Sequence, residues 1–421
     1  MGGVKLSKTG ANSNLGLYWR RYFKNSFLLN LPYVVLFLTT FFTLPIVLRN
    51  IPKQDYGLYA FVFAFEEWLV SATGLNITAG MKKGIANGLD GTFIFALLKR
   101  FYILSIVGLV LSAVSFYLIY FKQKIIMGEL FVVLAVYAIT GALLRPMLIE
   151  FLVAKKAFKA LAVWKVVLYT LPYLISAYVA FISKDVVLYT GFQLGGISFL
   201  SFVGCLFLFK RFNLVQRYKE KRIDRQCYEY GLKLIPVDII SVFAFKLSSF
   251  IIGPLFGYAN LAIYSVAETI RGKSSEMIKN FRSLFYADFA KLADTDLKHK
   301  LRRNFKLMFL FSAGISALLM IAGCLYIYFF LPSSYHEAII YFIILGVSFP
   351  ASILDIVLQT SMEAHLKHKE LAIRRVIPDL IKIVIILGFG LKWKIIGVCF
   401  GVAISMWVGL TISYYLTLKD E

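Results

Sequence analysis

The feature that most constrains the fold is a series of apolar blocks, each about twenty residues long, separated by short polar connections. A helix of that length crosses a bilayer core of about 30 Å. The sequence therefore predicts an all-α, polytopic membrane protein with about twelve transmembrane helices in two six-helix bundles around a central cavity. The predicted spans are 28–48, 57–80, 101–120, 126–150, 162–182, 186–209, 233–254, 258–280, 307–331, 337–360, 374–391 and 395–417.

Lysine and arginine are distributed unevenly between the two sets of connections. If the N-terminus is inside, the cytoplasmic connections, together with the polar inner ends of spans 258–280 and 374–391, hold 34 of these residues, and the outer connections hold 7. Because basic loops stay on the cytoplasmic side, both termini are predicted to be cytoplasmic, in a multi-pass protein of the bacterial inner membrane. This placement explains most of the net charge of +23. Membrane lipid is therefore the expected partner, and no nucleic acid is expected.

The basic stretch 210–230 lies halfway along the chain and divides it. Pro32 and Pro236 open the first helix of each half, and Tyr59 and Tyr264 stand early in the second helix. Both halves start on the same side, which permits parallel repeats. The predicted parts are a cytoplasmic N-terminal segment (1–27), an N-terminal six-helix bundle (28–209), a cytoplasmic basic linker (210–230) and a C-terminal six-helix bundle (231–421).

Two segments carry a family resemblance. The first, 48–88, contains a short outer turn with Tyr56, Gly57 and Tyr59, and the second, 246–272, opens the other half in a similar way. They resemble polysaccharide exporters of the multidrug/oligosaccharidyl-lipid/polysaccharide (MOP) superfamily, which include Wzx-type O-antigen flippases. Many of these relatives have an acidic–basic pair where this chain has Ser248 and Ser249, so no role of that pair is transferred.

The resemblance implies a transporter that flips an undecaprenyl-pyrophosphate-linked oligosaccharide, such as an O-antigen repeat unit for lipopolysaccharide, from the cytoplasmic to the periplasmic leaflet by alternating access. Polysaccharide polymerase and chain-length proteins are the implied partners. The sequence contains no P-loop and no nucleophile–base triad. We therefore expect coupling to H⁺ or Na⁺ rather than to ATP, and neither a cofactor nor a metal.

Three alternatives stay open at this stage. A multidrug/cation antiporter of the same superfamily would share the helix plan, and so would a lipid II-type flippase, although these typically have additional helices. A membrane polymerase or ligase would need a large outer loop for its chemistry. The outer connections are only a few residues long, which argues against that enzyme.

Charged residues inside predicted spans are the main candidates for a site, because each costs roughly 2.5–3.5 kcal/mol on insertion scales. Lys246 and Arg145 are predicted to attract the anionic headgroup, as an ammonium and as a bidentate guanidinium. Glu66 and Glu67 are about 15 Å below the outer edge by helical rise, where a carboxylate could couple transport to a cation. A structural pair between one of these glutamates and Lys246 is the competing interpretation.

Other polar residues in the spans are secondary candidates. Asp238 and Asp355 lie in the inner third of their spans, where either could pair with a basic residue. Lys165, Lys233 and Lys382 lie closer to the inner ends and are expected to extend to the interface. Tyrosines near the outer turns, Tyr56, Tyr59, Tyr258 and Tyr264, are typical of an interfacial aromatic belt.

Overall fold

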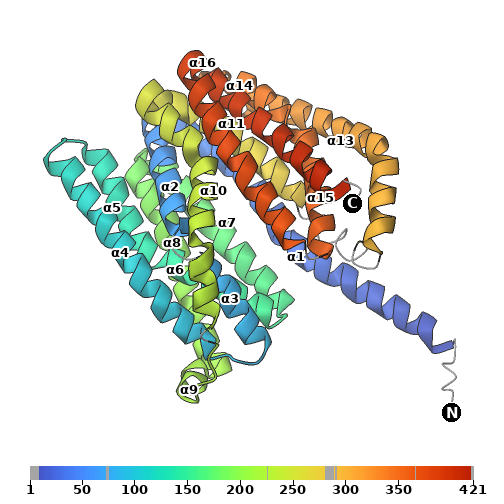
Figure 1. Cartoon of the computed structure of the whole chain (residues 1–421). Coiled ribbons are helices and arrows are strands. Elements are labelled where there is room, and N and C mark those ends of the chain that lie inside the picture. Colours follow the sequence, from blue (N-terminus) through green and yellow to red (C-terminus); the bar gives the residue numbers. More distant parts are fainter. Residues whose placement is uncertain are drawn as a thin grey trace, which may run out of the picture.

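The computed structural model describes residues 9–72, 75–224, 226–279, 289, 292–365 and 367–418, and within these ranges all regular structure is helical (Figure 1). The predicted all-α class is confirmed. Many helix surfaces expose Leu, Ile and Phe, as at Phe42, Leu109 and Leu310, which suits a lipid-facing exterior.

The helices of the first half, here residues 9–224, run back and forth through the molecule. They are α1 (Thr9–Asn50), α2 (Lys53–Ala72), α3 (Leu75–Ala86), α4 (Thr92–Tyr120), α5 (Ile125–Ile139), α6 (Gly141–Ala154), α7 (Phe158–Ser183), α8 (Val186–Phe212) and α9 (Leu214–Lys219).

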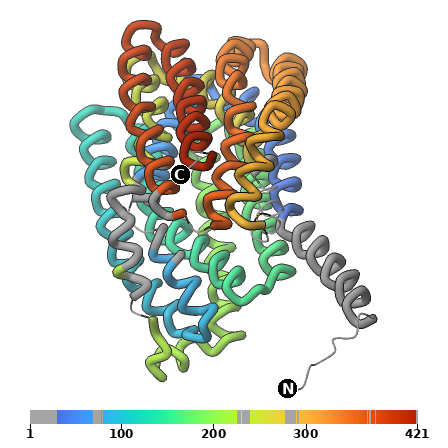
Figure 2. Tube along the Cα trace, turned by 45° about the vertical axis from the view of Figure 1, so that its right-hand side comes forward, coloured from blue at the N-terminus to red at the C-terminus, as the bar shows by residue number. Residues whose placement is uncertain are grey.

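The second half, here residues 226–418, repeats this pattern. It comprises α10 (Gln226–Phe256), α11 (Tyr258–Lys279), α13 (Asp294–Phe330), the 3₁₀ turn η1 (Ser333–Tyr335), α14 (Ala338–Gly346), α15 (Phe349–Ala364) and α16 (His368–Leu418). In both views the orange and red helices α13 to α16 lie next to one another (Figures 1 and 2), whereas α10 of the second half packs against α2 and α3 of the first.

Each predicted span contains helix, but several spans are not single rods. In the described chain, eight helices are long and apolar enough to cross a membrane, or nine if α14 and α15, bent by 40°, form one span. Predicted span 126–150 is two helices, α5 and α6, because Thr140 leaves helical geometry at φ −117° and ψ −85°. Two predicted spans form α16, which turns sharply at Trp393 and Lys394.

The two ends of the molecule differ in how the halves meet. At the short-loop end, defined by the connections 51–52, 121–124, 184–185 and 331–337, one hydrophobic core includes residues of both halves. At the basic end, defined by the connections 87–91, 155–157 and 213–224, two further cores lie entirely within one half each. Of the described residues, those of the two halves therefore share a continuous core only at the short-loop end, although α10 also runs along α2 and α3.

Part of the predicted linker packs on the first half. Leu214 of α9 is fully buried, and the Asp224 backbone N–H donates to Thr92 Oγ1 at 2.8 Å. The buried carboxylate of Asp90 lies 2.5 Å from Lys155 Nζ and 3.5 Å from Arg217 Nε of α9. These contacts attach residues 213–224 to the basic end of the first half, whereas the predicted limits of the four parts of the chain stay predictions.

Candidate functional site

The central feature of the molecule is an ion pair between its halves. Glu67 on α2 and Lys246 on α10 form a direct carboxylate–ammonium contact, at positions that the sequence placed near mid-membrane. Lys246 Nζ also lies 5.0 Å from the centre of the Phe245 ring, within the range of a cation–π interaction. Two of the predicted site residues are therefore in direct contact, and their contact connects the halves.

Glu66, the neighbour of Glu67, faces a different environment. Its side chain is only 3% exposed, and the charges that act on it are those of Glu67, Arg145 and Lys246. Adjacent helical residues point about 100° apart, so α2 directs Glu67 to the second half and Glu66 toward Arg145 and Tyr137 of the first half.

Arg145 lies inside the first half. Its guanidinium carbon is 5.9 Å from the centre of the Tyr169 ring, and Tyr137 and Tyr173 also interact with it electrostatically. A cation held against aromatic faces keeps one side of its planar donor fork available for a phosphate or carboxylate.

The helix that carries Arg145 is shaped by a proline and a second arginine. Pro146 cannot donate the usual hydrogen bond to the carbonyl four residues earlier, which belongs to Ala142. Arg100 on α4 donates to that carbonyl at 2.9 Å and is fully buried. Sequence reasoning missed Arg100, which it assigned to a cytoplasmic connection. The available signal was its spacing, because Phe93, Ala96, Arg100 and Leu104 share one buried stripe of α4.

The second half contributes two lysines beside one aromatic ring. Lys382 Nζ of α16 lies 5.2 Å from the centre of the Phe245 ring, which Lys246 also contacts. The charges of Lys246 and Arg271 act on Lys382, as do those of Glu268 and Asp379. The expectation that Lys382 extends to the interface is wrong, since the side chain is 4% exposed. Its position on α16 turns it inward, against α10 and α11.

We define the central charged cluster as the ionisable residues that these contacts bring together. Its members are Glu66, Glu67, Arg145, Lys246, Glu268, Arg271 and Lys382.

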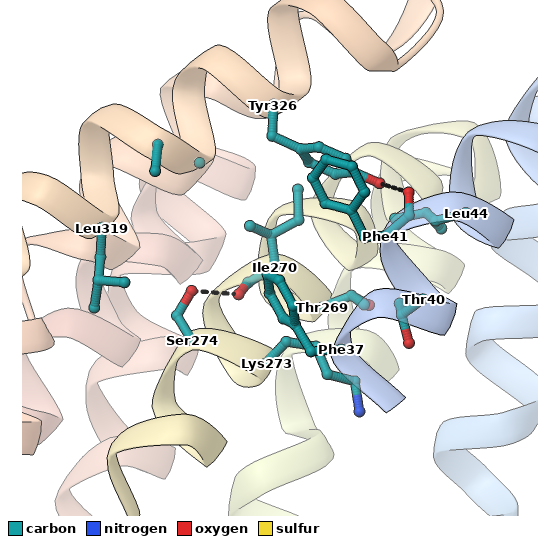
Figure 3. Close-up of a pocket in the computed structure, with 12 residues that line it drawn as sticks. Phe37, Thr40, Phe41, Leu44, Thr269, Ile270, Lys273, Ser274, Leu319 and Tyr326 are labelled. Atoms are coloured by element: carbon teal, nitrogen blue, oxygen red, sulfur yellow. Dashed lines mark hydrogen bonds between the residues drawn. The ribbon is translucent and has the colours of Figure 1, made fainter. Parts of the chain in front are cut away.

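An apolar cavity lies beside this cluster, between α1, α11 and α13. It has a volume of about 240 Å³ and is lined by Phe37, Phe41, Ile270 and Leu319, among others. Figure 3 shows Phe41 and Tyr326 together, where the Tyr326 hydroxyl donates to the Phe41 carbonyl at 2.8 Å, and Lys273 away from them. The cavity thus combines an apolar wall with one ammonium group, which is paired with Glu276 at 3.1 Å.

The secondary candidates have separate environments. Asp355 is a structural acceptor: it forms an ion pair with Arg374 of α16 and receives a hydrogen bond from the Ser413 hydroxyl. Lys165 donates to the Tyr33 hydroxyl at 3.2 Å and lies over its ring, so α7 uses it to hold α1. Asp238 belongs to α10, and its side chain and that of Lys233 lie outside the described residues.

Two of the outer-turn tyrosines are buried within the protein rather than exposed in an aromatic belt. Tyr264 is fully buried and Tyr56 is 6% exposed, which corrects the expected interfacial position. Tyr59 donates to Gln193 Oε1 at 3.1 Å. The predicted turn motif is therefore part of the shared core at the short-loop end.

Comparison with known proteins identifies the class. Residues 46–340 match a family described as polysaccharide biosynthesis protein. Because that match covers more than half of the sequence, the chain belongs to this family. No curated protein sequence matches the chain.

The fold is that of MOP-superfamily transporters. A MOP transporter from Pyrococcus furiosus, whose binding pocket is described as reversed in polarity, has a TM-score of 0.67 at 15% identity over 94% of both chains. A multidrug resistance MATE transporter in its inward-facing conformation has a TM-score of 0.65 at 14% identity over 93% of both chains. A multidrug resistance MATE transporter in an outward-facing conformation has a TM-score of 0.65 at 14% identity, over 94% of this chain and 97% of that chain. Likeness at this identity establishes the fold alone.

Proposed function

We propose that the protein flips a lipid-linked oligosaccharide, with an undecaprenyl-pyrophosphate carrier and an O-antigen or similar repeat unit, from the cytoplasmic to the periplasmic leaflet of the bacterial inner membrane. Membership of the polysaccharide biosynthesis family and the transporter fold support a transport role. A polysaccharide polymerase and chain-length proteins would take over the product.

The observation that carries this proposal is the buried Lys382 of the second half, on which two further cations act. The charges of Lys246 and Arg271 oppose that of Lys382, although each of these two is also paired with a carboxylate, Lys246 with Glu67 and Arg271 with Glu268. Two lysines beside the Phe245 ring attract a pyrophosphate, because its phosphate groups relieve their repulsion with charge-assisted hydrogen bonds. Arg145, across the interface, supplies a planar donor for a phosphate or for an acidic sugar.

The apolar cavity supports the same substrate class. Its wall of Phe37, Phe41 and Leu319 offers a prenyl chain a surface at the level of the membrane interior, and Lys273 stands where an anionic headgroup would follow. A lipid-linked sugar has both of these parts, whereas a free sugar has neither.

A flipping assay in cells tests the proposal. In a strain that lacks this gene and any redundant flippase, the lipid-linked repeat unit should stay in the cytoplasmic leaflet, and the wild-type gene should restore its transfer. Lys382→Met should reduce the restored rate about tenfold or more, the effect of losing about 1.4 kcal/mol of binding to the headgroup. The exposed Lys122→Met is the matched control. Transfer that continues in the deletion strain would contradict the proposal.

A multidrug/cation antiporter is the second candidate, and the buried Glu66 favours it, since a carboxylate at 3% exposure could alternate between a proton and a cationic drug. Ethidium efflux distinguishes the two. Efflux that depends on the chain and is lost in Glu66→Gln would support the antiporter, and its absence in cells that flip the lipid would support the flippase.

A further inference from the structure

The backbones of the two halves come into close contact at Gly57, at the start of α2. A β-carbon built on Gly57 would lie 1.7 Å from the carbonyl oxygen of Tyr258 and 2.5 Å from its carbonyl carbon. Both atoms are backbone atoms at the start of α11, so no side-chain rotation removes the overlap. α2 and α11 can therefore meet in this way only with glycine at position 57.

The residues around Gly57 make this contact a packed one. The Tyr258 ring meets the Phe61 ring edge to face, with centres 5.7 Å apart, and Leu261 and Ala262 are fully buried beneath it. Gly257, at φ +95°, supplies the left-handed residue between α10 and α11. This turn presents the Tyr258 carbonyl to α2.

Other contacts at the same end also join the halves. Arg49 of α1 donates to the carbonyl of Phe330 on α13 at 3.2 Å. Lys53 Nζ lies 5.4 Å from the centre of the Tyr335 ring. Together with the shared hydrophobic core, they close the short-loop end, whereas among the described side chains the hydrophobic cores at the basic end lie within one half each.

We propose that the Gly57–Tyr258 contact is the closure contact of the short-loop end. The absence of a side chain at residue 57 allows α2 and α11 to meet, and this meeting holds the protein in the conformation that opens toward the basic end. Any side chain at residue 57 shifts the population to conformations in which the short-loop end is open. This inference rests on the alternating access proposed above.

Distances between spin labels test the contact without measuring transport. Labels are placed in a chain whose four native cysteines are replaced by alanine, on exposed positions at both ends. One pair, Gln123 and Ser334, reports on the short-loop end, and the other, Asn87 and Lys300, reports on the basic end. Purified protein in lipid vesicles is measured with Gly57, Gly57→Ala and Gly57→Val.

With glycine, the short-loop pair should give one short distance. Gly57→Val should lower the closed population about tenfold or more, with a smaller decrease for Gly57→Ala, and the basic-end pair should become shorter. Gly191→Ala is the matched control, because a β-carbon at Gly191 meets no atom within 4 Å. Its distances should equal those of the wild type.

The outcomes separate the two proposals. If the short-loop end opens and the basic end does not change, the closure contact is supported and alternating access is overturned. If neither distance changes in a Gly57→Ala or Gly57→Val protein that remains monodisperse and thermally stable, the closure contact itself is overturned. Should Gly57→Val fail to fold, the comparison of Gly57→Ala with Gly191→Ala decides.

Discussion

At the residue scale, the Glu67–Lys246 pair could stabilise the fold, bind the substrate or do both. A single substitution cannot separate these two roles. Removing either charge leaves the other without its partner, which destabilises a partly buried site. The same substitution also removes a group that could bind the substrate. A reversal of both charges keeps the attraction and changes only which half carries the cation.

We therefore expect Lys246→Met to lose both thermal stability and flipping. The double variant Glu67→Lys/Lys246→Glu should regain most of the stability, because the opposite charges still meet. Its flipping rate should stay about tenfold or more below wild type, since Lys382 and Arg271 would face a carboxylate instead of an ammonium. Thermal unfolding in detergent and the flipping assay measure the two effects separately. A double variant that flips normally would assign the pair a purely structural role.

At the element scale, α6 shows how a broken helix is stabilised from outside. Pro146 leaves the Ala142 carbonyl without its helical donor, and Thr140 bonds to Ser198 of α8 at 3.0 Å where the chain departs from the helix. Arg100 satisfies the freed carbonyl from α4. The direction of α6, and so of Arg145, depends on contacts from two neighbouring helices.

A double-mutant cycle tests this dependence. Arg100→Met should lower the free energy of unfolding by about 1–3 kcal/mol, the usual cost of leaving a buried carbonyl unsatisfied. In a Pro146→Ala background the helix can satisfy Ala142 itself, so the same substitution should cost less, with a coupling of about 1 kcal/mol. Lys99→Met, on the exposed neighbour of Arg100, is the control. Equal costs in the two backgrounds would show that Arg100 acts through other contacts.

The elements also show what hydropathy can and cannot predict. Predicted span 101–120 lies within α4, but the helix begins at Thr92, because Phe93 and Ala96 pack against protein at the basic end. Residues 126–150 are apolar throughout, so hydropathy alone could not indicate the break at Thr140. The Glu67–Lys246 pair was one of the predicted alternatives. Arg100 and Lys382 were missed because their burial depends on helices that are distant in sequence.

At the scale of the whole molecule, the unequal ends correspond to one state of the alternating access proposed above. Packed interfaces tend to have discrete arrangements rather than intermediate ones. Among the described side chains, the halves share a core at the short-loop end, and the cores at the basic end lie within one half each. The central charged cluster lies between these regions, where a change of charge can favour one arrangement over the other.

Glu66 is the residue we expect to connect an ion gradient to this change. It is buried within the first half, and it and Glu67 both interact with Lys246 of the second half, so binding a cation or proton there alters the attraction between the halves. In vesicles, wild-type flipping should accelerate when an H⁺ or Na⁺ gradient is imposed. Glu66→Gln keeps the shape and removes the charge, so its rate should be equal with and without the gradient. Glu129→Gln, an exposed position on α5, should respond like wild type. If Glu66→Gln still responds to the gradient and Glu67→Gln does not, the coupling residue is Glu67, in the ion pair between the halves.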